Sequence, residues 1–290
     1  SLSALKTWNG SATKNTYFAN LTAIDNRTVT LTANWTANTY TINYSLGDNT
    51  SFPATLGSKA PKSATYDISI EISTPTREGY VFAGWTLSGD DISTAQSGAS
   101  STSLTAWDGG ANRNRYFKNL TPDASGSVTM KATWQATIAS SITATMPAKD
   151  SNNEYYLINN INNLAWLALQ GDKASVAGKF RQTNNITIPN NILWLPIGRL
   201  GSFSGTYDGQ GYAISRLSSY NGTDANRNYL ETNGGLFANA GGAKIKNVII
   251  EDAEIYGQNA GIIAGSGNAS TNISNCVVSG TVNGTNAGSI

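Results

Sequence analysis

The sequence has no histidine, one cysteine and few charged residues, and each shortage excludes a class of protein. Without histidine there is no His-based catalytic triad, and the commonest general base and transition-metal ligand are both missing. Cys276 has no partner for a disulfide within the chain, and its strand register predicts that it faces inward as a small hydrophobe. We therefore expect no enzyme activity, no cofactor and no metal site.

Charge and long apolar runs are also scarce. Charged residues make up 13% of the chain, against about 25% in an average globular protein. The formal net charge is +1 with no basic run, which argues against nucleic-acid binding. No stretch approaches about 18 apolar residues, so we expect no membrane insertion within this sequence. The polar share is carried by Asn, Thr, Ser and Gly, which favours an all-β fold of strands and tight turns.

The first half of the chain contains a duplication. Residues 5–35 recur at 104–134 with a constant offset of 99 and no gap, and 14 of the 31 positions are identical. This predicts one complete repeat unit at 36–134, with 1–35 as the C-terminal part of a preceding unit. Alternating apolar and polar residues or turn signals predict its strands, which are Tyr40–Leu46, Tyr66–Ile72, Tyr80–Trp85 and Val128–Trp134.

The string Thr-Pro-Thr-Arg-Glu-Gly-Tyr-Val-Phe-Ala-Gly-Trp at 74–85 is the most specific feature of this unit. Together with Tyr40-Thr-Ile-Asn-Tyr and the closing strand at 128–134, it resembles the Listeria–Bacteroides repeat, the B-repeat of internalin-type surface proteins. The resemblance implies small β-grasp-like modules strung in tandem on secreted bacterial proteins. The unit departs from the family in about 20 extra residues after Trp85, an insert around 88–103 that forms either a loop or an added hairpin.

Trp85, Trp107 and Trp134 allow two interpretations. Their aromatic faces could form a platform for sugars, or they could make up the core of a small module. We favour core packing, because one or two tryptophans supply much of the core in a module of this size.

The second half, 151–290, follows a segment at 135–150 that reads as a linker or a first edge strand. A short apolar strand is predicted at Tyr155–Ile158. Residues 160–169 carry the only convincing amphipathic helix, with Gly171 as its stop, and this helix is placed to cap the start of the following repeats.

Beyond this helix, short apolar strands alternate with Gly and Asn in units of about 27 residues. Three strings align with offsets of 26, 28 and 27, namely 235–237 with 261–263, 245–250 with 273–278, and 255–257 with 282–284. Three short strands per unit predict a right-handed parallel β-helix whose coils stack at about 4.8 Å. Asn247 and Asn275 recur at one turn, where their side chains could form a hydrogen-bonded ladder.

These units resemble the GLUG motif, a repeat of bacterial surface proteins and of immunoglobulin A peptidases. The string Phe-Ser-Gly-Thr-Tyr-Asp-Gly-Gln-Gly at 203–211, after Trp194–Gly198, resembles the coils that lead into such repeats. In the peptidases the catalytic metal-binding residues belong to a separate domain, so the resemblance implies no protease activity here.

Asp208 is the one residue that suggests catalysis, since β-helix lyases and hydrolases carry acids on their strands. Hydrolysis needs a second carboxylate about 5 to 10 Å away. The candidates are Asp224, Glu231, Glu251, Asp252 and Glu254. Because Asp-Gly-x-Gly is itself a turn signature, we interpret Asp208 as a turn residue. Asp90 and Asp91 in the insert are too few for a calcium site.

Repetition predicts a non-catalytic cell-surface adhesin, stalk or extracellular fibre component of a bacterium, with reach supplied by stacked repeats. The alternatives are a glycan-binding module, using the flank of the predicted β-helix or the insert at 88–103, and a β-helix carbohydrate-active enzyme. No ligand-binding residue is predicted. The expected partner is a glycan or protein of a host or neighbouring cell, and self-association through the ends of the β-helix is a second expectation.

Overall fold

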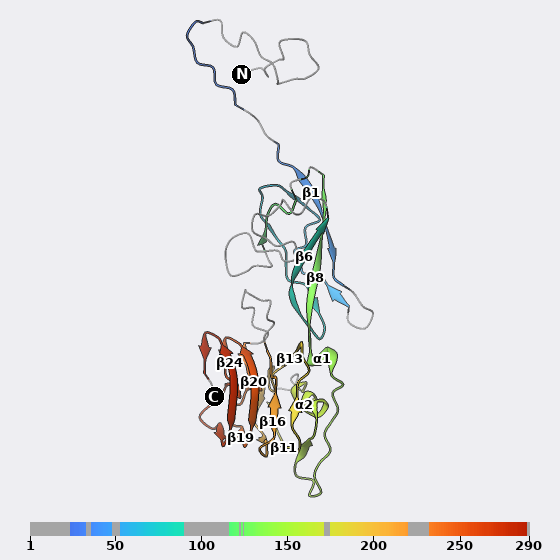
Figure 1. Cartoon of the computed structure of the whole chain (residues 1–290), viewed down its shortest axis with the longest axis vertical. Helices are drawn as coiled ribbons and strands as arrows, with labels where there is room; N and C mark the ends of the chain where they lie inside the picture. Colours follow the sequence, from blue (N-terminus) through green and yellow to red (C-terminus); the bar gives the residue numbers. More distant parts are fainter. Residues whose placement is uncertain are drawn as a thin grey trace. The chain divides into compact units, whose positions relative to one another are not determined.

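The computed structural model describes residues 24–32, 36–47, 53–89, 116–121, 123, 125–170, 175–219 and 232–288. The chain divides into two compact units, Ser1–Ala37 and Asn38–Ile290, and all the helices and strands in the described residues belong to the second (Figure 1). Its described residues form many short strands and two short helices, which confirms the predicted all-β class. No helix in the described residues is long and apolar enough to span a membrane.

Residues 38–137, here called the sheet region, are organised around one central strand. This strand, β8 (Ser127–Thr137), pairs in parallel with β1 (Thr39–Ser45) and antiparallel with β6 (Tyr80–Gly89). On its other side β1 pairs antiparallel with β3 (Ser63–Thr65). In β1, buried residues alternate with exposed ones, as the sequence predicts for a half-buried strand.

Among the described residues of the sheet region there are four further strands, of two residues each. They form two antiparallel pairs, of β2 (Ala54–Thr55) with β5 (Thr76–Arg77) and of β4 (Ile70–Glu71) with β7 (Tyr116–Phe117). The predicted strand Tyr66–Ile72 is therefore wrong for most of its length. Asp67 has a φ of 68°, and its N–H donates to the side chain of Asn119, which makes a turn where a strand was expected.

The core of the sheet region lies on one face of these strands. Its buried residues are Tyr40, Ile42, Ala64, Ile72, Trp85, Leu87, Phe117, Leu120, Val128, Met130 and Ala132. Trp85 is 1% exposed, which confirms the prediction that it packs in the core. Trp134 is only partly buried and donates from Nε1 to the Leu46 carbonyl at 2.8 Å, so it sits at the edge of the core. Trp107 lies outside the described residues.

Residues 135–150 differ from the linker expected there. β8 continues to Thr137 and pairs in parallel with β13 (Ile192–Leu193). The four-residue helix α1 (Ile138–Ser141) follows at once, and Ile138 is fully buried among residues of the second half. Farther on, the Thr145 N–H donates to the Asn162 carbonyl at 3.0 Å. Because Ile138 is apolar, burying its side chain is more favourable than leaving it in water. The segment is therefore packed against the second half of the chain and does not act as a free linker.

Residues 138–288 are here called the stacked region. After α1 they continue with β9 (Tyr156–Ile158) and α2 (Ile161–Ala168). The helix confirms the predicted 160–169 to within one residue at each end. Asn160 is its N-cap, and its side chain accepts from the Asn163 N–H at 3.1 Å.

Along the rest of the stacked region, strands pair in parallel with strands farther along the chain, and the stretch from one strand to its partner is here called a circuit (Figure 1). The longest sheet has the order β23-β19-β15-β11-β9, and the next longest has the order β12-β16-β20-β24. Shorter parallel sheets join β10 to β14, β17 to β21 and β25, and β18 to β22. The strand bounds, in chain order, are β10 Ser175–Val176, β11 Lys179–Gln182, β12 Ile186–Thr187, β14 Ser202–Phe203, β15 Thr206–Asp208, β16 Ala213–Ser215, β17 Asn233–Gly234, β18 Phe237–Asn239, β19 Lys244–Lys246, β20 Ile249–Tyr256, β21 Asn259–Ala260, β22 Ala264–Ser266, β23 Asn272–Ser274, β24 Val277–Asn283 and β25 Asn286–Ala287.

The pairing register follows the sequence repeat. Ile245 pairs with Ile273, and Ile255 pairs with Val282, at the offsets of 28 and 27 found in the sequence. Asn233 pairs with Asn259 at an offset of 26. The number of strands was predicted wrongly, because the repeat from β17 to β20 holds four strands rather than three. The aligned string 235–237 lies where β17 ends and β18 begins, and the string 245–250 is divided between β19 and β20.

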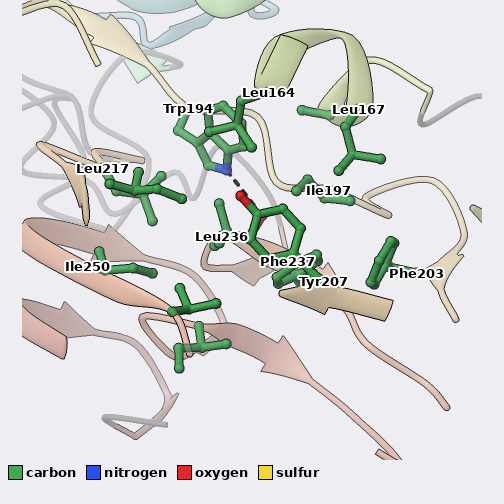
Figure 2. Close-up of a cluster of buried hydrophobic side chains, with 14 of the residues drawn as sticks. Leu164, Leu167, Trp194, Ile197, Phe203, Tyr207, Leu217, Leu236, Phe237 and Ile250 are labelled. Atoms are coloured by element: carbon green, nitrogen blue, oxygen red, sulfur yellow. Dashed lines mark hydrogen bonds between the residues drawn. The ribbon is translucent and has the colours of Figure 1, made fainter. Parts of the chain in front are cut away.

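The core of the stacked region is continuous and rich in aromatic rings. Tyr156, Phe180, Phe203 and Phe237 follow one another from circuit to circuit, with successive ring centroids 5.4, 5.9 and 4.8 Å apart. Figure 2 shows α2 covering part of this core with Leu164 and Leu167, which are both fully buried. The same view shows Trp194, whose Nε1 donates to the Leu236 carbonyl at 3.2 Å.

Candidate ligand-binding surface

Asp208 ends β15 and is almost fully buried, with its side chain 5% exposed. Its Oδ1 accepts from the Gln210 N–H at 3.1 Å and from Asn247 Nδ2 at 2.9 Å, and its Oδ2 lies 3.1 Å from Lys246 Nζ. The first bond closes the turn at Asp208–Gly211, and the other two tie that turn to the next circuit. Both carboxylate oxygens are therefore engaged in holding the fold.

The electrostatics of Asp208 agree with this structural role. Burial by itself would raise the pKa of the carboxyl, but the hydrogen bonds from Asn247, Lys246 and Gln210 together lower the pKa below its ordinary value. A general acid for hydrolysis at neutral pH requires the opposite shift, a raised pKa. Asp208 is thus suited to remain a charged, hydrogen-bonded anchor.

The other candidate acids do not join Asp208 in one sheet. Glu251, Asp252 and Glu254 are exposed on β20, which belongs to the sheet of β12, β16 and β24, whereas Asp208 lies in the sheet of β9, β11, β19 and β23. Among the described residues, no group of three or more Asp, Glu, Cys or His side chains could hold a metal ion. Asp224, Glu231, Asp90 and Asp91 lie outside the described residues.

A hydrogen-bonded ladder of asparagines exists, but at a different corner from the one predicted. Asn247 and Asn275 both adopt left-handed backbone, with φ of 56° and 53°, and serve as turn residues. The ladder is formed instead by Asn233, Asn259 and Asn286. Asn259 Nδ2 donates to Asn233 Oδ1 at 2.7 Å, and Asn286 Nδ2 donates to Asn259 Oδ1 at 2.8 Å.

The most distinctive outward-facing group surrounds Tyr155, the residue directly before β9. The guanidinium of Arg181 lies 3.9 Å from the centroid of the Tyr155 ring, and Lys179 Nζ lies 5.7 Å from it. Lys179 forms an ion pair with Glu154, and Arg181 lies 3.7 Å from Asp150. We call these residues (Asp150, Glu154, Tyr155, Lys179 and Arg181) the Tyr155 cluster.

The charges of the Tyr155 cluster are fixed by local hydrogen bonds. Asp150 Oδ1 accepts from the N–H groups of Glu154 and Tyr155 at 2.8 and 3.1 Å, and these bonds lower the pKa of Asp150. The hydrogen bond to Glu154 raises the pKa of Lys179. Arg181 Nε is buried without a hydrogen-bond partner. An aromatic ring beside oriented cations and carboxylates offers the kinds of contact that a carbohydrate or a polar peptide uses.

Sequence reasoning missed the Tyr155 cluster because its members come from the turn segment before β9 and from β11. The signal was present as two basic residues at alternate positions, Lys179 and Arg181, in a segment where no strand was predicted. Of the other predicted features, Cys276 is partly buried and packs against the core of the stacked region, and burial raises its pKa. The insert at 88–103 lies outside the described residues except for Ser88 and Gly89.

Comparisons with known proteins give no relative to set beside this geometry. No protein-family model matches the chain, and neither the curated proteins nor the solved structures contain a match.

Proposed function

We propose that the chain is part of a non-catalytic bacterial cell-surface stalk or adhesin, built from repeats that extend it away from the cell. The observation that carries this proposal is the agreement between sequence repeat and strand register in the stacked region. The offsets of 26 to 28 residues between the aligned strings are also the offsets between the strands paired from β17 to β25. Repeats that pair only with their neighbours lengthen a protein without any change to its core.

In this proposal the stacked region is a right-handed parallel β-helix of the GLUG type, and the sheet region is a β-grasp-like module of the Listeria–Bacteroides type. The repeated circuits and the parallel pairs support the first assignment. The central β8 between β1 and β6, together with the quoted sequence strings, supports the second. Both repeat types resemble parts of secreted bacterial proteins, so we place the chain on the outside of the cell.

The non-catalytic part of the proposal rests on Asp208. Its two carboxylate oxygens accept hydrogen bonds from Gln210 and Asn247 and pair with Lys246. Such a carboxylate has a lowered pKa and is poorly suited to give or take a proton at neutral pH.

Localisation and adhesion can be tested directly. Antibodies against the full chain should label intact cells of the producing bacterium, and mild protease treatment of these cells should remove the label. Beads coated with the chain should adhere to host or neighbouring cells more strongly than beads coated with an unrelated protein. Label found only after cell lysis would overturn the surface assignment, and beads that do not adhere would leave a stalk without adhesive function.

Glycan binding at the Tyr155 cluster is a second candidate, favoured by the ring and the oriented charges found there. A glycan array probed with the full chain should then give signals that Tyr155→Ala reduces. Tyr212→Ala is the matched control, because Tyr212 is also a surface tyrosine, at 38% exposure, but belongs to another turn. Equal signals from both variants would exclude the cluster as the binding site.

We also propose that copies of the chain associate through the last circuit, formed by β23, β24 and β25. Here Ile273, Val278 and Val282 are only partly buried, whereas their partners Ile245, Ile250 and Ile255 one circuit earlier are fully buried. Light scattering over a range of concentrations should show association. A strictly monomeric protein at high concentration would overturn this part of the proposal.

A further inference from the structure

The first and last strands of the sheet region are direct neighbours and run in the same direction. β1 and β8 pair in parallel over five registered positions, from Thr41 with Ser127 to Ser45 with Lys131. The chain enters the region at the start of β1 and leaves it at the end of β8. These two points therefore lie at opposite ends of the paired segment.

This arrangement decides how tension acts on the strand pair. A pull on the residues before β1 and after β8 draws the two strands past each other along their length. All the hydrogen bonds between them are then loaded together, in shear. In an antiparallel hairpin pulled at its two open ends, by contrast, the bonds are loaded and broken one after another.

From this geometry we propose that the sheet region is a mechanical clamp, whose β1–β8 pair resists tension along the chain. The relevance of such a clamp to the organism rests on the proposed stalk, because a stalk that anchors a cell is pulled at its ends. The mechanical property itself belongs to the fold and does not depend on where the protein is located.

Side chains reinforce the β1–β8 pair on both faces. On the inner face Tyr40, Ile42, Val128 and Met130 are at most 2% exposed, so water has little access to the hydrogen bonds on that side. On the outer face Asn43 Nδ2 donates to Ser127 Oγ at 2.8 Å. Beyond the last registered pair, Trp134 Nε1 of β8 donates to the carbonyl of Leu46, which directly follows β1.

The exit from the clamp is also anchored. Thr137, the last residue of β8, donates from Oγ1 to the Gly79 carbonyl at 2.8 Å and pairs with Leu193. The next residue, Ile138, is buried in the core of the stacked region. Force applied through the stacked region therefore reaches β8 through packed residues.

Single-molecule pulling on the full chain in two directions tests the clamp. With the native thiol removed by Cys276→Ser, handles on Ala37→Cys and Ala139→Cys load β1 against β8 in shear. Both alanines are exposed and flank the clamp. Handles on Ala37→Cys and Asp123→Cys are the control, since Asp123 lies just before Ser125, whose N–H donates to the Thr39 carbonyl at the start of β1. This second pair opens the same strands from one end.

We expect the rupture force in shear to exceed the rupture force in the control direction several-fold at the same loading rate, because forced unfolding is governed by the barrier along the loaded path. Equal forces, or a weaker response in shear, would overturn the clamp. Thermal melting of each variant checks that it is folded, and Thr36→Cys with Ser141→Cys supplies a second shear pair if the first is not. Surface labelling of cells does not depend on this result, so failure of the clamp is distinguishable from failure of the stalk proposal.

Discussion

The sheet region and the stacked region are both built from strands, but their strands find partners at very different distances along the chain. In the sheet region, Ile42 pairs with Val128, and the strands β3 and β6 lie between these two residues in the sequence. In the stacked region, most strands pair with a strand one circuit earlier or later, as Ile245 pairs with Ile273.

This difference has consequences for cooperativity. Closing a long loop before any contact is gained is unfavourable, so strands paired across the whole region form together or not at all. Circuits that contact only their neighbours can be added or lost one at a time. The sheet region is therefore suited to resist force as one body, and the stacked region is suited to supply length.

The largest test of this comparison is the removal of a large core side chain from the sheet region. Trp85→Ala should destabilise that region by about 3–5 kcal/mol, the usual range for deletion of a buried aromatic side chain. Urea unfolding followed by far-UV circular dichroism measures the change. A loss below about 1 kcal/mol would mean that the long-range core is not what holds the region together.

A smaller effect is expected from Asp208, which links two circuits of the stacked region. Asp208→Asn should cost about 2 kcal/mol at neutral pH, because it weakens hydrogen bonds made to a charged, buried acceptor. The folded pKa of Asp208 lies below the ordinary value of 3.8, so the stability it contributes is present above that value and is lost as the pH falls below it.

The pH dependence distinguishes this mechanism from a simple packing defect. Urea unfolding measures the free energy of unfolding near neutral pH and at about pH 3. The difference in this free energy between wild type and Asp208→Asn should be smaller at the lower pH. The control is Asp252→Asn, because Asp252 is exposed and its φ of 53° suits asparagine equally well. A stability difference that does not change with pH would contradict the role assigned to the charged carboxylate of Asp208.

The two buried tryptophans allow a matched comparison of the regions at the level of one hydrogen bond. Trp194 Nε1 donates to the Leu236 carbonyl, whereas Trp85 Nε1 is buried without a partner. Replacement by Phe removes a similar volume at both sites but removes a hydrogen bond only at Trp194. We expect Trp194→Phe to cost about 1 kcal/mol more than Trp85→Phe in urea unfolding. Equal losses of stability in the two variants would show that the removed side-chain volume alone determines the cost.

Much of the stacked region could be predicted from the sequence, because its repeat offset is also its strand register. The strings at 245–250 and 273–278 align in the sequence and pair in the structure at Ile245–Ile273 and Ile250–Val278. The helix α2 was also predicted, since its apolar spacing and its cap at Asn160 are local signals.

The parts that could not be predicted depend on partners remote in sequence. The turn at Asp67 relies on Asn119, and the burial of Ile138 relies on residues of the stacked region. The Tyr155 cluster likewise combines a turn with a strand more than twenty residues later. A local sequence pattern carries no information about such remote partners. Local propensity therefore predicted a strand around Asp67 and a linker around Ile138.

The smallest effect tests whether side-chain ladders stabilise the stacked region beyond its core. Asn259 donates to Asn233 and accepts from Asn286, so Asn259→Ala removes two ladder bonds, whereas Asn286→Ala removes one at an exposed position. We expect a loss of about 1 kcal/mol for Asn259→Ala and about 0.5 kcal/mol or less for Asn286→Ala, because water replaces exposed hydrogen bonds at little net cost. Urea unfolding of both variants beside wild type measures the difference. If neither variant lost measurable stability, the ladder would add nothing to the stacking of the apolar core.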